Sequence, residues 1–170
     1  MGRFKAISLA TLGAIGVQPI VFLAWIGLPA VIAGEFSAFM DVARFSYLAA
    51  VFSVPFVVFI GVPATLFLAS SNKLRWWVLG LIGFVSAGAP IALSTPGGGS
   101  GYSSGGNWYG ESVQFVVNGE PTLYGWLNYV QSILFFGLHG LVGALVFYVI
   151  WRRSMGPNTS FKPTPSARLN

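Results

Sequence analysis

The stretch from Leu123 to Trp151, LYGWLNYVQSILFFGLHGLVGALVFYVIW, decides the fold because it contains no Asp, Glu, Lys or Arg. About 20 apolar helical residues cover a hydrocarbon core of roughly 30 Å, and a charged side chain in that core is costly. Three further stretches are equally free of charge, and they run from Ala6 to Ala33, from Phe45 to Ser70 and from Trp76 to Leu93. The pattern predicts an all-α fold, a four-helix transmembrane bundle.

The composition also favours a lipid environment. Only 8% of the residues are charged and 55% are hydrophobic, whereas an ordinary soluble domain carries roughly 25% charged residues. The sequence has no cysteine, which excludes disulfides, thiolate nucleophiles and cysteine metal sites. The net charge is +5. The basic residues that produce it lie at the edges of apolar runs, where they attract anionic lipid head groups. We expect the lipid bilayer as partner, no nucleic acid and no cofactor.

The distribution of Lys and Arg predicts the orientation, because short cytoplasmic loops hold the excess of positive charge. Eight of the nine basic residues lie before the first stretch, between the second and third, or after the fourth. Only Arg44, in a predicted turn from Gly34 to Arg44, lies on the other side. Both termini are therefore expected to be cytoplasmic. The eight are Arg3, Lys5, Lys73, Arg75, Arg152, Arg153, Lys162 and Arg168.

Two features beside these basic residues need an interpretation. Trp76, Trp77 and Trp151 are typical of anchors at the membrane interface. The first stretch, with Val31-Ile32-Ala33 before Gly34, also resembles a secretory signal with a cleavage site. A signal has an apolar core of roughly 7–15 residues, and the run from Ala6 to Ala33 is much longer, so we expect it to be retained as a span.

The long outer loop, residues 94–122, divides into two parts. Pro96 to Asn107 is dominated by Gly and Ser, which bury too little apolar surface to offset chain entropy, so this part is expected to be flexible. In Glu111 to Thr122, apolar and polar residues partly alternate before Asn118-Gly119, a pair that suits a tight hairpin turn. A small β-hairpin and an irregular loop are both compatible with this second part.

The polar, proline-containing segment 155–170 is expected to be a disordered cytoplasmic tail behind a single membrane domain, residues 1–154. Its last residues, NTSFKPTPSARLN from Asn158 to Asn170, resemble the C-terminal ends of many unrelated small bacterial proteins encoded on the mobile gene cassettes of integrons. The resemblance implies a bacterial source, hence an inner-membrane location, and a dispensable tail. It implies nothing about activity.

Strongly polar groups within the predicted spans are candidates for function. His139 lies midway along the fourth stretch, where it is either a relay or ligand-binding group, or a buried neutral imidazole bonded to a neighbouring helix. Gln18 precedes Pro19 in the first stretch, and it either contacts a substrate or repairs the hydrogen-bonding defect that proline creates. The prolines predict bends in the first two helices; they are Pro19, Pro55 and Pro63.

Small residues at spacings of three and four recur on one stripe of the third and of the fourth stretch. Such residues let helix backbones approach closely, which drives helix association in lipid. The two stripes are therefore predicted packing faces, either within one chain or between chains. They comprise Gly80, Gly83 and Ala87, and Gly137, Gly140 and Ala144.

Charged residues of the outer side form a second candidate site. Carboxylates beside an arginine could perform acid–base chemistry or hold a cation, whereas a solvated rim requires no activity at all. The group comprises Glu35, Asp41, Arg44, Glu111 and Glu120.

Three functions remain open from the sequence. A non-catalytic inner-membrane protein would act by packing against itself, as a homo-oligomer, or against another membrane protein. An oligomeric small-solute transporter or channel would use the bent helices with Gln18 and His139 as lining groups. A membrane enzyme acting on lipid or cell-wall precursors would use the outer carboxylates. The absence of a reactive cluster within the apolar stretches favours the first.

Overall fold

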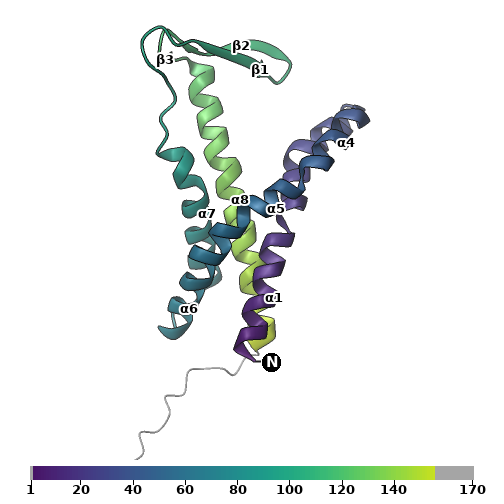
Figure 1. Ribbon diagram of the computed structural model, residues 1–170, viewed down its shortest axis with the longest axis vertical. Helices are drawn as coiled ribbons and strands as arrows, with labels where there is room; N and C mark the ends of the chain where they lie inside the picture. Colours follow the sequence, from purple (N-terminus) through teal and green to yellow (C-terminus); the bar gives the residue numbers. More distant parts are fainter. Residues whose placement is uncertain (1, 156–170) are drawn as a thin grey trace, which may run out of the picture.

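The computed structural model describes residues 2–155, which form a helical molecule with a small sheet at one end (Figure 1). The predicted tail beyond Met155, including the cassette-like sequence, lies outside the described residues. The helical elements are α1 (Arg3–Gly16), α2 (Gln18–Phe22), η1 (Leu23–Gly27), α3 (Leu28–Ile32), α4 (Phe36–Phe45), α5 (Tyr47–Phe56), η2 (Val57–Gly61), α6 (Val62–Ser70), α7 (Trp76–Ala92) and α8 (Leu123–Met155), and the strands are β1 (Ser104–Trp108), β2 (Glu111–Val117) and β3 (Glu120–Pro121).

Three helical stretches are long and apolar enough to cross a membrane, as judged by length and composition: Arg3–Ile32, Phe36–Ser70 and Leu123–Met155. The fourth apolar helix, α7, has 17 residues, which correspond to about 26 Å. It is therefore slightly shorter than a hydrocarbon core of roughly 30 Å. The predicted all-α character holds for the membrane-length part of the chain, and the sheet is confined to the loop before α8.

The second long helix begins earlier than predicted. The turn expected from Gly34 to Arg44 is in fact a short connection around Gly34, which adopts a φ of 78°, followed by the helix α4. Phe39 of α4 packs against η1, where its ring lies 3.1 Å from the position that a Cβ on Gly27 would occupy. The charges of Asp41 and Arg44 predict a turn here, but these residues belong to the helix α4, which contacts η1 through Phe39.

Two turns of these long helices are π-helical, and each ends two residues before a proline. Proline has no N–H, and its ring clashes with the carbonyl group four residues earlier. For Pro29 that carbonyl belongs to Trp25 in η1, and for Pro63 it belongs to Phe59 in η2. The wider π turn accommodates the proline without ending the helix.

The prolines singled out in the sequence therefore act differently from one another. At Pro19 the helix is interrupted, since α1 ends at Gly16 and α2 begins at Gln18. Pro55 lies within the regular helix α5, whereas Pro63 follows a π turn. The π turn before Pro29 was not foreseen.

The packing faces meet within the chain, between α7 and α8. A Cβ added at Gly83 would collide with the carbonyl oxygen of Gly140 and lie 2.8 Å from the Cβ of Ala144. A Cβ added at Gly140 would collide with the carbonyl oxygen of Gly83 and lie 2.7 Å from the Cβ of Ala87. Only glycine permits this backbone contact.

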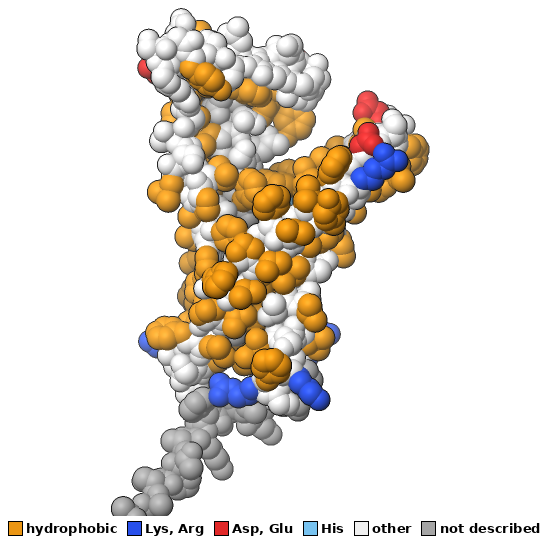
Figure 2. Space-filling view, in the orientation of Figure 1, with side chains coloured by type: hydrophobic (Ala, Val, Ile, Leu, Met, Phe, Trp, Pro, Cys, Tyr) orange, Lys and Arg blue, Asp and Glu red, His pale blue; other side chains and the backbone are white. Residues whose placement is uncertain are grey.

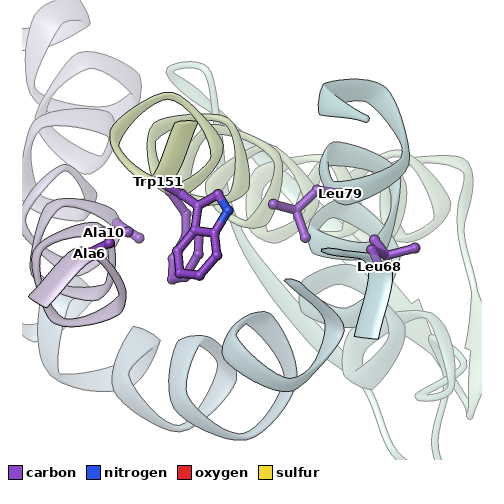
Figure 3. Close-up of a cluster of buried hydrophobic side chains, with 7 residues drawn as sticks. Ala6, Ala10, Leu68, Leu79 and Trp151 are labelled. Atoms are coloured by element: carbon purple, nitrogen blue, oxygen red, sulfur yellow. The ribbon is translucent and has the colours of Figure 1, made fainter. Parts of the chain in front are cut away.

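A buried cluster at the opposite end from the sheet joins α1 to α8. Ala6, Ala10 and Ala14 recur every four residues and are almost fully buried. Figure 3 shows the Trp151 ring between the alanines of α1 and Leu79 of α7. The interpretation of Trp151 as an interface anchor is wrong, because only 5% of it is exposed.

The outer loop forms a three-stranded antiparallel sheet in the order β1-β2-β3. The predicted hairpin is present, with Val117 opposite Glu120 across the Asn118-Gly119 turn. The expectation of flexibility fails for Ser104 to Asn107, which belong to β1 and pair with β2. Pairing with an apolar strand orders this segment despite its Gly-rich composition.

The charged side chains separate along the long axis of the molecule. Figure 2 shows basic side chains gathered at the end that carries the N-terminus, and acidic ones at the opposite end. The basic residue at the acidic end is Arg44, whose Nη1 lies 3.4 Å from Oδ1 of Asp41. The starts of α1 and α7 and the ends of α6 and α8 lie together at the basic end (Figure 1).

Candidate functional site

A cavity of about 460 Å³, here called the inner cavity, lies among the three long helical stretches and α7. All four contribute to its lining, which is predominantly apolar. Its volume falls within the range of small-molecule sites, about 300–1,000 Å³. The polar residues of the lining are Gln18, Ser53, Thr65, Ser86 and His139.

Gln18 reaches this cavity from the break between α1 and α2, and only 3% of it is exposed. Its Nε2 donates to the carbonyl oxygen of Ala14 at 2.9 Å and to that of His139 at 3.3 Å. The amide therefore closes the end of α1 and bridges to α8. Its Oε1 is buried and has no hydrogen-bond partner among residues 2–155.

His139, which lines the same cavity, carries a second buried acceptor without a partner among residues 2–155. Its Nδ1 lies 2.9 Å from the carbonyl oxygen of Phe135, and because a carbonyl oxygen can only accept a hydrogen bond, Nδ1 carries the proton. This bond lies within α8, whereas one of the two sequence-based interpretations of His139 expected a bond to a neighbouring helix. In the neutral ring Nε2 is then an acceptor, and it is buried without a partner in the described part of the chain.

The two unpaired atoms cannot satisfy one another, because both are acceptors. The remaining polar groups of the cavity are already satisfied by their own helices. The hydroxyls donate to carbonyl oxygens three or four residues earlier: Ser53 to Ala50, Thr65 to Gly61, and Ser86 to Ile82. A molecule with a hydrogen-bond donor and an apolar body would complement this lining.

A second cavity, the outer pocket, has a volume of about 530 Å³ and lies nearer the sheet. Figure 2 shows the molecule hollowed between the sheet and the arm that ends in α4. The pocket has no charged residue in its lining, which combines η1, the hairpin turn of β1-β2 and α8. The lining comprises Ala24, Trp25, Ile26, Pro29, Tyr109, Asn128, Gln131, Ser132 and Phe135.

Phe135 lines both cavities. Its ring centroid lies 4.4 Å from that of His139 in the inner cavity and 6.0 Å from that of Trp25 in the outer pocket. The ring centroid of Phe22, in α2, lies 6.2 Å from that of Phe135. An aromatic cluster thus occupies the boundary between the two spaces.

The outer charged residues are divided between two parts of the fold. Glu35, Asp41 and Arg44 belong to α4 and its start, whereas the remaining carboxylates, Glu111 and Glu120, begin strands of the sheet. None of the five lines either cavity. The Asp41–Arg44 ion pair is exposed, and such a pair contributes little to stability.

Comparison of the chain with protein-family models, curated proteins and solved structures finds no match. Within residues 2–155, no group of three or more His, Asp or Glu side chains is arranged to hold a metal ion. The site must therefore be interpreted from its own chemistry.

Sequence reasoning identified Gln18 and His139 but missed the outer pocket. A signal was present in α8, where Asn128 and Gln131 place two amides three residues apart near the outer end of an apolar stretch. Polar residues at such a spacing share one helix face. Their relation to Trp25 and Tyr109 depends on how three elements pack, which no local pattern reveals.

Proposed function

We propose that this chain is a multi-pass protein of the bacterial inner membrane that binds a small, uncharged and mostly apolar molecule carrying a hydrogen-bond donor. The observation that carries the proposal is the pair of buried, unpaired acceptors, Gln18 Oε1 and His139 Nε2, which belong to two residues that line one apolar cavity. A buried acceptor without a donor costs about 1–3 kcal/mol. Ligand binding would remove that cost.

The membrane assignment is supported by three apolar helices of sufficient length, with α7 as a fourth, shorter span beside α8. Large side chains of the second helix, including Phe52, Phe59 and Phe67, are about 70% exposed or more, which suits contact with lipid chains. The basic end supports cytoplasmic termini. The bacterial source rests on the resemblance of residues 158–170 to cassette-encoded tails.

The proposal retains the non-catalytic character favoured by the sequence and uses the lining groups expected of a transporter. Association between chains through the glycine stripes has less support, since both stripes are occupied within the chain. An outer-face enzyme also has less support, because its carboxylates lie on separate elements. Binding in the inner cavity accounts for more of the buried polar groups than either.

The experiment measures binding of 4-(trifluoromethyl)phenol to the protein in lipid nanodiscs by fluorine NMR, with empty nanodiscs as reference. 4-(Trifluoromethyl)anisole, which lacks the O–H donor, is the matched ligand. We expect the phenol to bind roughly fivefold more tightly than the anisole, as one net hydrogen bond allows. Gln18→Met and His139→Phe each remove one of the two acceptors, and at least one of these variants should lose that preference.

Ser53→Ala is the control variant, because the Ser53 hydroxyl lines the cavity but donates to Ala50 of its own helix. It should leave the preference for the phenol intact. Equal binding of phenol and anisole to the unmodified protein would overturn the proposal. A preference that survives both Gln18→Met and His139→Phe would do the same.

A further inference from the structure

We propose that the outer pocket is a second binding site for the same class of molecule, an uncharged apolar compound with a hydroxyl group, and that Phe135 separates it from the inner cavity. This inference rests on the proposed function. It adds a site, a set of recognising residues and a route between the outer face and the inner cavity.

The chemistry of the outer pocket suits a neutral hydroxyl compound. Asn128 and Gln131 supply amide groups, which donate and accept, as a hydroxyl does. Trp25, Tyr109 and Phe135 supply apolar aromatic surface. Because no charged side chain among residues 2–155 lines the pocket, this part of the chain offers no counter-ion to an anionic or cationic ligand.

The position of Tyr109 supports a role at this pocket. Tyr109 adopts a φ of 50° in the turn between β1 and β2, a conformation that is uncommon for a bulky residue. Its hydroxyl accepts a hydrogen bond from Gln131 Nε2 at 3.1 Å, and its ring contacts that of Trp108. The phenolic O–H remains available to donate to a ligand, since Gln131 uses only its acceptor capacity.

Each of the two cavities is also lined by one π-helical turn. Ala24, Trp25 and Ile26 of η1 line the outer pocket, and η2 lines the inner cavity. Single π turns inside helices occur frequently at functional sites. A π turn shortly before a proline is therefore found at both cavities.

The test uses a photoactivatable phenol, 4-[3-(trifluoromethyl)-3H-diazirin-3-yl]phenol, with the full chain in nanodiscs and peptide mapping of the labelled residues. We expect two groups of labelled residues, one around each cavity. Gln131→Leu should reduce labelling of the outer pocket by about fivefold, through loss of hydrogen-bonding groups. The same variant should leave labelling of the inner cavity largely unchanged.

Gln114→Leu is the matched control, because Gln114 is an exposed glutamine of β2 that lines neither cavity. Phe135→Ala should shorten the time needed to label the inner cavity, because the ring at the boundary is removed. Labelling of the inner cavity alone would overturn this inference and leave the proposed function standing. Outer labelling that is equal in Gln131→Leu and Gln114→Leu would also overturn it, whereas labelling of neither cavity would overturn both proposals.

Discussion

Gln18 combines a structural role with the proposed binding role in one side chain. Its two N–H groups are used to join the end of α1 to α8, which fixes the direction of its Oε1. The oxygen is therefore held in place at the wall of the inner cavity by these two bonds. A site arranged in this way is organised before a ligand arrives, which reduces the ordering cost of binding.

Gly83 and Gly140 provide the sharpest test of the packing. Gly83→Ala or Gly140→Ala should lower the free energy of unfolding by about 1–3 kcal/mol, because the added Cβ meets a backbone carbonyl that has little room to move. The measurement is a denaturation titration from mild detergent into SDS.

Gly16→Ala is the control for these variants. A Cβ at Gly16, the last residue of α1, meets nothing within 4 Å. That substitution should be neutral or stabilising by up to about 1 kcal/mol. Equal destabilisation by all three variants would contradict the close approach of α7 and α8.

The π turns show how local chemistry shapes a cavity. Pro63→Ala would restore a backbone N–H that can bond to the carbonyl of Phe59, worth about 1 kcal/mol. We therefore expect a more stable protein with regular helix at η2, and weaker binding of the fluorinated phenol, because Gly61 and Thr65 would rotate relative to the cavity. Thermal unfolding and fluorine NMR report the two effects.

Pro55→Ala serves as the control for Pro63→Ala. Pro55 lies in regular helix and does not line the inner cavity. Pro55→Ala should leave the affinity for the fluorinated phenol unchanged. An equal loss of affinity in both variants would contradict the role of η2, because it would show that any change in the second helix disturbs binding.

The helices could be predicted from the sequence because absence of charge is a local property of each stretch. The start of the second helix could not, since Glu35, Asp41 and Arg44 interrupt the apolar pattern, although Phe36, Phe39 and Met40 follow helical spacing. The strand β1 depends on pairing with β2, which lies outside any local window. The sequence identified Gln18 and His139 as lining groups of one open function. The apolar residues that enclose them depend on the rotation of four helices, which no local pattern gives.

The separation of charge along the molecule predicts its placement in a membrane, and the chain's lack of cysteine makes this directly testable. A membrane-impermeant maleimide applied to intact cells should label Ser100→Cys, in the outer loop, but not Ser71→Cys, between α6 and α7. Both should react after the cells are permeabilised, which serves as the control. Labelling of Ser71→Cys in intact cells would contradict cytoplasmic termini.

The contact between Gly83 and Gly140 also bears on biosynthesis. The ribosome completes α7 before it starts α8, and during that interval the glycine face of α7 has no backbone against which to rest. With 17 residues, α7 is at the short limit for spanning a bilayer alone. We therefore expect α7 and α8 to leave the insertion machinery as a pair, and a nascent chain truncated before Leu123 to be recognised as incomplete.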